Sequence, residues 1–267
     1  MIPHLMDFRA DPAVLITQAL DGYAPLVRKL ASHDSLDPDV SVAAALALGR
    51  IHGQCLDIAW LEDVPFPLPI GDPMTPEEYC GQAAEYPLFA AWMPRVETAL
   101  QNLAEEWRQT FFIHGDFKAD NLHLNADPGK TGRPRIVVVD WELAGRGEPL
   151  WDVGSYVGSV LAIWIDRLGH DAGAFSLFEA AGASAFQRQI GHFLITYRHL
   201  MPEAAGNMDR FVLSSLRYAG IFFLHRVLAG LSTTGRVSAS GSLMLHMAEA
   251  LLIRTERAAA VLLPGLR

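Results

Sequence analysis

The sequence predicts an α+β protein that is mostly helical, with short strands confined to its first half. Two observations support this fold class. Short apolar runs separated by turn residues occur only before residue 142, whereas helical periodicity fills the chain from residue 155 onwards. The 267 residues contain 51% hydrophobic side chains, which is ample for a packed core.

The first twenty residues predict a β-hairpin. IPHLMDF, residues 2–8, can pair with the apolar run of residues 12–22 across a turn at residues 9–12. A lone two-stranded hairpin is marginally stable in water, and its free edge invites further strands. We therefore expect a partner chain or a second copy of this protein to contact residues 2–20.

A helix is expected next, and then a long loop. Asp37 is typical of an N-cap and Pro38 of a first helical residue, and they predict a helix through Cys55. Residues 61–76 contain five prolines, which excludes a helix there. After Pro94, apolar residues recur at helical spacing as far as residue 107 and predict an amphipathic helix.

Two polar loops follow that helix. FFIHGDFKADNLHL, residues 111–124, places polar side chains between two apolar ends, which predicts a loop held between strands. RIVVVDW, residues 135–141, predicts the partner of the second strand, joined to it by a turn-rich segment. The remaining periodicity predicts four helices, at residues 155–168, 173–200, 208–231 and 239–262.

Composition excludes several function classes. The net charge is −9 and the chain has only three lysines, which argues against nucleic acid as a partner. No uninterrupted apolar run approaches the roughly 20 residues that cross a bilayer, so no membrane association is expected. The start lacks the pattern of a secretory signal, which makes the cytoplasm the expected location. Two cysteines are too few for a disulfide framework.

The two polar loops contain the groups that phosphoryl transfer requires. A kinase needs an aspartate that accepts the proton of the attacking hydroxyl, an amide oxygen a short loop away that holds a metal, and a second carboxylate that bridges metal and nucleotide phosphates. Asp116, Asn121 and Asp140 supply these groups in that order. Turn formation alone would also explain aspartate and asparagine in loops.

The motifs HGDFKADN and VVVDWELAGRGEPLWDVG resemble the catalytic core of the aminoglycoside phosphotransferase and choline kinase family, which has a protein-kinase-like fold. The resemblance implies that residues 25–267 form the large C-terminal lobe, with catalytic loops at 114–152 and C-terminal helices at 155–262. It implies that residues 1–24 are a short hairpin and hinge in place of a full small lobe.

The resemblance also implies residue roles. Asp116 would be the catalytic base, and Asn121 and Asp140 would bind Mg²⁺ and the nucleotide. His114 would be a structural member of the catalytic loop, and Asp152 would brace that loop from the next helix.

Four further roles remain open. Lys118 could approach the transferred phosphate or be a solvated loop residue, and Glu142 could support the metal or face solvent. AVLITQALDG resembles the strand and hinge that contact adenine in this family, which would place Gln18 and Leu20 at ATP. The family's acceptor site lies between the catalytic loop and the C-terminal helices, which makes Trp151 a candidate to line it, although ordinary core packing is the favoured role for this residue.

One departure from the family bears on function. The glycine-rich loop and the lysine that bind phosphates precede the hinge in this family, but here no lysine precedes Lys29 and no glycine precedes Gly22. Two alternative functions are therefore considered. The first is an ATP- and magnesium-dependent kinase that phosphorylates a hydroxyl of a small molecule or peptide side chain, with a reduced or borrowed small lobe. The second is a pseudokinase that serves as a binding or scaffolding module.

Overall fold

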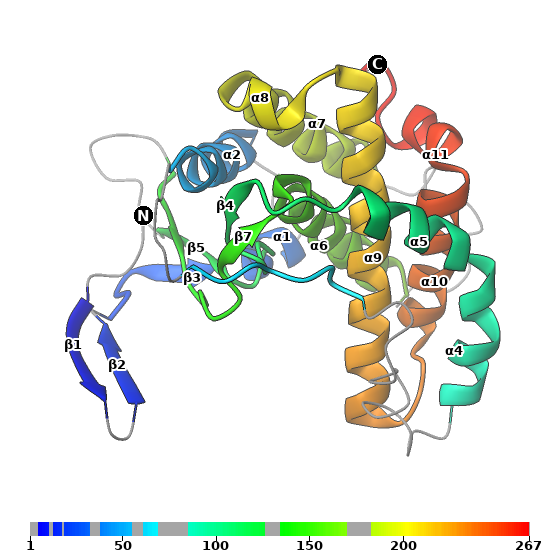
Figure 1. The fold of residues 1–267 in the computed structure, drawn as a ribbon, viewed down its shortest axis with the longest axis horizontal. Helices are drawn as coiled ribbons and strands as arrows, with labels where there is room; N and C mark the ends of the chain where they lie inside the picture. Colours follow the sequence, from blue (N-terminus) through cyan, green and yellow to red (C-terminus); the bar gives the residue numbers. More distant parts are fainter. Residues whose placement is uncertain are drawn as a thin grey trace.

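The computed structural model of the protein describes eight parts of the chain, to which every structural statement below refers: residues 5–10, 13–17, 19–32, 38–54, 61–68, 85–125, 134–169 and 183–266. Helices make up most of these parts and three small sheets make up the rest, which confirms the predicted fold class. Most of the C-terminal helices pack together on one side of the molecule, and β1, β2, β3 and β5 lie toward the other (Figure 1).

The predicted N-terminal hairpin is present. Strand β1 (Leu5–Ala10) pairs antiparallel with β2 (Ala13–Thr17), so that Ala10 lies opposite Ala13 across the turn. In Figure 1 this hairpin lies at the edge of the molecule opposite the C-terminal helices.

The second sheet contains both strands predicted around the polar loops. Its order is β3 (Tyr23–Pro25), β5 (Leu122–Asn125) and β6 (Ile136–Val138), and both pairings are antiparallel. Strand β3 was not predicted, because three residues are too few to show a period of two. Residues 23 and 24 thus pair with a strand of the catalytic region.

The third sheet joins the two ends of the catalytic region. Strand β4 (Phe111–Ile113) pairs antiparallel with β7 (Gly145–Gly147). The sequence did not predict β7, because its two glycines are unfavourable in strands. A Cβ atom on Gly145 would lie 2.6 Å from the carbonyl oxygen of Glu62, and one on Gly147 would lie 2.3 Å from Ile113 Cδ1. Glycine is therefore required here by close approach of neighbouring chain.

The helices before the catalytic region match the prediction in part. Helix α2 ends at His52, earlier than predicted, because the chain turns at Gly53; Cys55 and Asp37 lie outside the described residues. Helix α5 presents the predicted apolar stripe, with Val96, Leu100, Leu103 and Trp107 buried. These elements are α1 (Leu26–Ala31), α2 (Pro38–His52), α4 (Tyr86–Trp92), the 3₁₀ helix η1 (Met93–Arg95) and α5 (Glu97–Glu106).

The C-terminal helices confirm the prediction in type and correct it in bounds. The first begins at Pro149, six residues earlier than expected, and the last is divided at Arg254, where no Gly or Pro gives a stop signal. The elements are α6 (Pro149–Gly169), α7 (Ala183–Leu200), the short α8 (Pro202–Ala205), α9 (Met208–Thr234), α10 (Ala239–Ile253) and α11 (Thr255–Leu262).

Helix α9 is the central helix of the core. It packs against α6 and α10, and α6 approaches it closely through Gly154 and Gly158, where a Cβ atom would lie 2.3 Å from Tyr218 and 2.7 Å from Phe222. By length and composition α9 is the one described helix that could cross a membrane, contrary to expectation. Its most apolar window is 72% buried inside the fold, which is the position of a core helix.

Candidate active site

Three polar side chains converge in the loop between β4 and β5. The Nζ atom of Lys118 lies 2.6 Å from Asp116 Oδ2. The side-chain amide of Asn121 donates to the same oxygen at 2.9 Å and to the backbone carbonyl of Asp116 at 3.0 Å. The backbone closes into a tight turn, since the Asn121 N–H donates to the Lys118 carbonyl at 3.0 Å. One carboxylate oxygen thus has two donors, which leaves Asp116 Oδ1 for a ligand.

His114 is fully buried at the start of this loop. Its Nε2 lies 2.9 Å from the Val139 carbonyl, and its Nδ1 accepts a hydrogen bond from the Asp116 N–H at 3.2 Å. A nitrogen that accepts from an N–H group carries a lone pair, so the proton is on Nε2 and the imidazole is neutral. His114 therefore connects the two loops and uses both ring nitrogens in bonds within the protein.

A buried carboxylate of α6 fixes the same loop from behind. Asp152 accepts from the backbone N–H of His114 at 2.7 Å and from that of Gly115 at 2.9 Å. Its Oδ2 also lies 3.0 Å from His52 Nε2, and both side chains are fully buried. His52 Nδ1 in turn lies 2.7 Å from the hydroxyl of Tyr197 on α7.

The proton positions in this network follow from Tyr197. Burial first, and then the charge of Asp152, raise the pKa of the Tyr197 hydroxyl well above its usual value. The hydroxyl therefore keeps its proton and donates to His52 Nδ1, which leaves the His52 proton on Nε2, facing Asp152. Three N–H groups from two elements thus converge on one carboxylate, which is why it can stay buried.

Gly115 is the one position of the loop where only glycine fits. Its φ is 81°, a left-handed conformation, and a Cβ atom there would lie 2.2 Å from the carbonyl oxygen of Leu143. The indole Nε1 of Trp151 donates to the Gly115 carbonyl at 2.7 Å. The first turn of α6 thus fixes both the N–H and the C=O of this glycine.

Asp140 leaves β6 beside this loop. The N–H of the preceding residue, Val139, donates to the Asn121 carbonyl at 3.0 Å, and the ring of the following residue, Trp141, lies 4.7 Å from that of His114. Asp140 is exposed and has a φ of 66°, which is unusual outside glycine. Glu142 is exposed as well. The two loops predicted to act together are therefore neighbours.

The predicted adenine contacts are described only in part. Leu20 is half-buried at the turn before β3, where its carbonyl accepts from the Tyr23 N–H at 3.1 Å. Gln18 lies outside the described residues. The hinge therefore stays a prediction.

The polar groups fit a magnesium ion shared with a nucleotide. Within the described ranges, no group of three or more His, Cys, Asp or Glu side chains could hold a metal ion. The Oδ1 of Asn121 and the exposed carboxylate of Asp140 are oxygen ligands of the kind that Mg²⁺ prefers, and this ion is commonly bound by one or two carboxylates together with substrate phosphates.

Comparison with known proteins places the chain in a family. A match to the phosphotransferase enzyme family covers residues 10–186, about two thirds of the sequence. The chain belongs to the phosphotransferase enzyme family. No curated protein sequence matches the chain significantly.

Solved structures resemble this family member over nearly its whole length. A choline/ethanolamine kinase family protein from Mesorhizobium loti is 16% identical, with a TM-score of 0.52 over 99% of this chain and 79% of that one. A glucosamine kinase is 16% identical, with a TM-score of 0.58 over 96% and 67%. Plasmodium vivax ethanolamine kinase is 14% identical, with a TM-score of 0.53 over 97% and 69%. These likenesses establish the protein-kinase-like fold.

Two residues near the catalytic loop of this phosphotransferase family member, Tyr197 and His225, were not predicted from the sequence. Asp152 contacts Tyr197 through His52, and the ring of His225 on α9 lies 5.8 Å from that of Trp151, but no local sequence pattern marks Tyr197 or His225. Trp151 was one candidate to line an acceptor site, with core packing as the favoured alternative; it is 6% exposed, and its indole N–H binds the loop.

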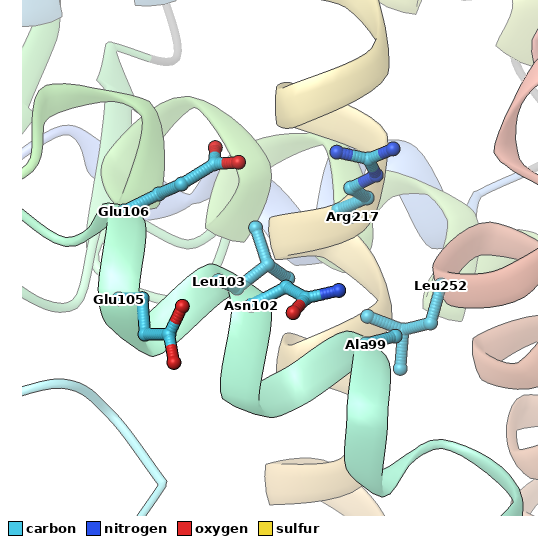
Figure 2. A pocket seen from close by; sticks show the side chains of 7 residues that line it. All are labelled: Ala99, Asn102, Leu103, Glu105, Glu106, Arg217 and Leu252. Carbon is cyan, nitrogen blue, oxygen red and sulfur yellow. The ribbon is translucent and has the colours of Figure 1, made fainter.

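A separate cavity of about 470 Å³ lies away from these loops. Figure 2 shows side chains of α5, α9 and α10 around it, with the carboxylates of Glu105 and Glu106 and the guanidinium of Arg217 among them. Arg217 Nε donates to Thr255 Oγ1 at 3.4 Å. None of the residues predicted to act in phosphoryl transfer lines this cavity, so the candidate active site remains the two polar loops.

Proposed function

We propose that the protein is an ATP- and magnesium-dependent phosphotransferase that phosphorylates a hydroxyl group of a small molecule. The observation that supports this most directly is the loop in which Asp116 holds Lys118 and Asn121 on one carboxylate oxygen. A carboxylate with its other oxygen open to a ligand suits a base that orients and deprotonates a hydroxyl.

The proposed reaction forms one bond and breaks one. The hydroxyl oxygen of the acceptor attacks the γ-phosphorus of ATP while Asp116 Oδ1 takes the hydroxyl proton. The bond between this phosphorus and the β,γ-bridging oxygen breaks, and ADP leaves with the bonding electrons. Lys118 neutralises Asp116 before the nucleotide binds, and its ammonium group is near enough to stabilise charge on the transferred phosphoryl group.

Asn121 and Asp140 would hold Mg²⁺, and Glu142 is a further exposed carboxylate near them. The ion would supply positive charge to the phosphate oxygens. In the proposed arrangement His114 and Asp152 take no part in proton transfer or in bond making. They hold the backbone of the loop, so that the base is already in place when the substrates bind.

A label-transfer experiment tests the proposal. The pure chain is incubated with γ-labelled ATP, Mg²⁺ and small hydroxyl compounds, among them the glucosamine and ethanolamine that appear in the names of the structural neighbours. Asp116→Asn should lower transfer by about 10²- to 10⁴-fold, because a general base contributes that much. Asp120→Asn is the matched control, since Asp120 is an exposed aspartate of the same loop. Equal loss in both variants would remove Asp116 from its role.

The same experiment separates the kinase from a pseudokinase. Nucleotide binding without transfer to any acceptor, unaffected by Asp116→Asn, would support a binding module. A small molecule is favoured over a peptide hydroxyl because small-molecule kinases share the fold. The cytoplasm is the location that we propose for this activity.

The N-terminal hairpin is the place where a partner would act. We expect a partner chain or a second copy to pair with β1 or β2 and to complete the nucleotide site. A monodisperse monomer whose hairpin amides resist hydrogen exchange would contradict this expectation.

A further inference from the structure

His225 of α9 faces the catalytic loop but has no part in the reaction described above. Its side chain is exposed to solvent. Desolvation by the surrounding protein is nevertheless the largest influence on its pKa and lowers it, while the charge of Asp116 raises that pKa and the charge of Lys118 lowers it. The His225 ring is thus open to solvent and close enough to the proposed base for the charge of Asp116 to act on it.

The position of His225 is fixed through α6. Tyr218 and His225 are seven residues apart on α9, and so lie on one face of the helix two turns from each other. Their ring centroids lie 6.3 Å and 5.8 Å from that of Trp151, whose indole N–H is bonded to the Gly115 carbonyl. The contact therefore runs from His225 through one side chain to the residue that precedes Asp116.

The proline-rich segment of residues 61–68 also reaches His225. Val64 holds the segment against β7 and α5, because its N–H donates to the Arg146 carbonyl at 2.8 Å and its carbonyl accepts from Trp107 Nε1 at 3.0 Å. Three residues later, the backbone of Pro67 forms a hydrogen bond with the His225 ring. Helix α9, the Trp151 side chain that holds the catalytic loop, and this segment thus meet at His225.

These contacts fix the chemistry of the imidazole. The backbone of proline has a carbonyl group and no N–H, so the ring nitrogen that faces Pro67 carries the proton. Burial, the largest cause, lowers the pKa of His225 and favours the neutral ring. The other ring nitrogen therefore has a lone pair, and a group that binds to it has to donate a hydrogen bond.

We propose that His225 is a specificity-determining residue that binds the phosphoryl acceptor through its second ring nitrogen. The acceptor then carries a hydroxyl or ammonium group in addition to the hydroxyl that reacts at Asp116. This inference rests on the proposed function, because Asp116 fixes where the reacting hydroxyl lies. It adds a residue from α9 and a requirement for a second donor on the substrate.

The test compares the wild type with His225→Ala, His225→Gln and the control His246→Ala. His246 is an exposed histidine of α10 whose ring bonds within its own helix. Transfer from γ-labelled ATP is measured to glucosamine, to ethanolamine, to the small-molecule fraction of a cell extract, and to water. Water has no second donor at the required distance, so it serves as the reference acceptor.

In His225→Ala, the KM for the acceptor should rise about threefold to tenfold, the effect of one neutral hydrogen bond. The ratio of transfer to the acceptor over transfer to water should fall in the same variant. His225→Gln should recover part of the loss, because its side-chain oxygen accepts a hydrogen bond. His246→Ala should match the wild type.

A second measurement needs only the wild-type protein. Carbethoxylation of His225 by diethyl pyrocarbonate is followed by mass spectrometry. It should slow when a compound that accepts phosphate in the transfer assay is present, whereas carbethoxylation of His246 should not change. An acceptor KM unchanged in both His225 variants, or equal modification of His225 with and without acceptor, would overturn the inference alone. A wild-type protein that labels no acceptor would reject the proposed function, and this inference with it.

Discussion

The two loops of the candidate active site lie side by side but are held in opposite ways. In the loop of residues 114–121, a buried carboxylate and a buried indole bind the backbone, and His114 uses both ring nitrogens within the protein. In the loop after β6, Asp140 and Glu142 are exposed, and Asp140 occupies a left-handed conformation without being glycine.

The difference corresponds to what each loop is proposed to hold. A base has to keep its position whether or not substrates are bound, so its loop is fixed by protein groups alone. Asp140, the proposed metal ligand of the second loop, must instead present an unshared carboxylate, and the interactions that repay its strain come from the ligand. Two aspartates of one site, Asp152 and Asp140, should therefore affect stability with opposite signs.

Asp152→Ala should have the largest effect. It would leave the N–H groups of His52, His114 and Gly115 buried without an acceptor, and the loss should lower the free energy of unfolding by about 3–5 kcal/mol. Urea titration followed by circular dichroism measures this. Asp166→Ala is the control, because that exposed aspartate pairs with Arg226 at the surface and should cost less than about 1 kcal/mol. Similar losses in both variants would mean that the buried network does not hold the loop.

Asp140→Gly should stabilise the protein and inactivate it. Glycine adopts a φ of 66° without strain, so the free energy of unfolding should rise by up to about 1 kcal/mol, while phosphoryl transfer is lost with the proposed metal ligand. The same urea titration, combined with label transfer, measures both effects. Asp140→Asn should keep the stability of the wild type, since asparagine tolerates this conformation, but should also lose transfer. A drop in stability in Asp140→Gly would contradict the contrast between the loops.

Glu148→Gln should have the smallest effect on the free energy of unfolding, and this effect should depend on pH. Burial, the largest cause, raises the pKa of this half-buried carboxyl, against the opposing influence of its hydrogen bond from Leu150 and of nearby arginines. Below the unfolded pKa of about 4.5 both states are protonated and the burial carries no penalty. As pH rises through the folded pKa, the folded state holds its proton longer, so the stability of the wild type falls.

Glutamine still accepts a hydrogen bond from the Leu150 N–H and carries no charge. The free energy of unfolding of Glu148→Gln should therefore equal that of the wild type in acid and exceed it increasingly as pH rises. Urea titrations at several pH values measure it, with the exposed Glu97→Gln as control for the change in charge. An advantage that is equal at every pH would show that burial of the charge is not its cause.

The sequence predicted the polar loops because their chemistry is local. HGDFKADN places Asp116 and Asn121 five residues apart, and the strands on either side are apolar enough to be recognised. Asp140 was found in the same way, at the end of a predicted strand, whereas the role of Asp152 came only from the resemblance of its motif to the family.

The supporting contacts could not be predicted, because they depend on how helices pack. His52 lies 100 residues before Asp152, and 145 residues separate it from Tyr197. His225 likewise gains its neighbours only when α9 packs against α6. Two strands were also missed, since β3 and β7 lack the apolar run that marked the equally short β4 and β6.

The buried hydroxyl of Tyr197 has a consequence for the order in which the protein can mature. A ribosome that has just completed Asp152 has made every side chain proposed for catalysis, but not the tyrosine that fixes the tautomer of His52. During synthesis the hydrogen bond that fixes the tautomer of His52 can therefore form only after α7 has emerged and docked against α2. The nascent chain thus carries all the proposed reactive groups before this support for Asp152 exists.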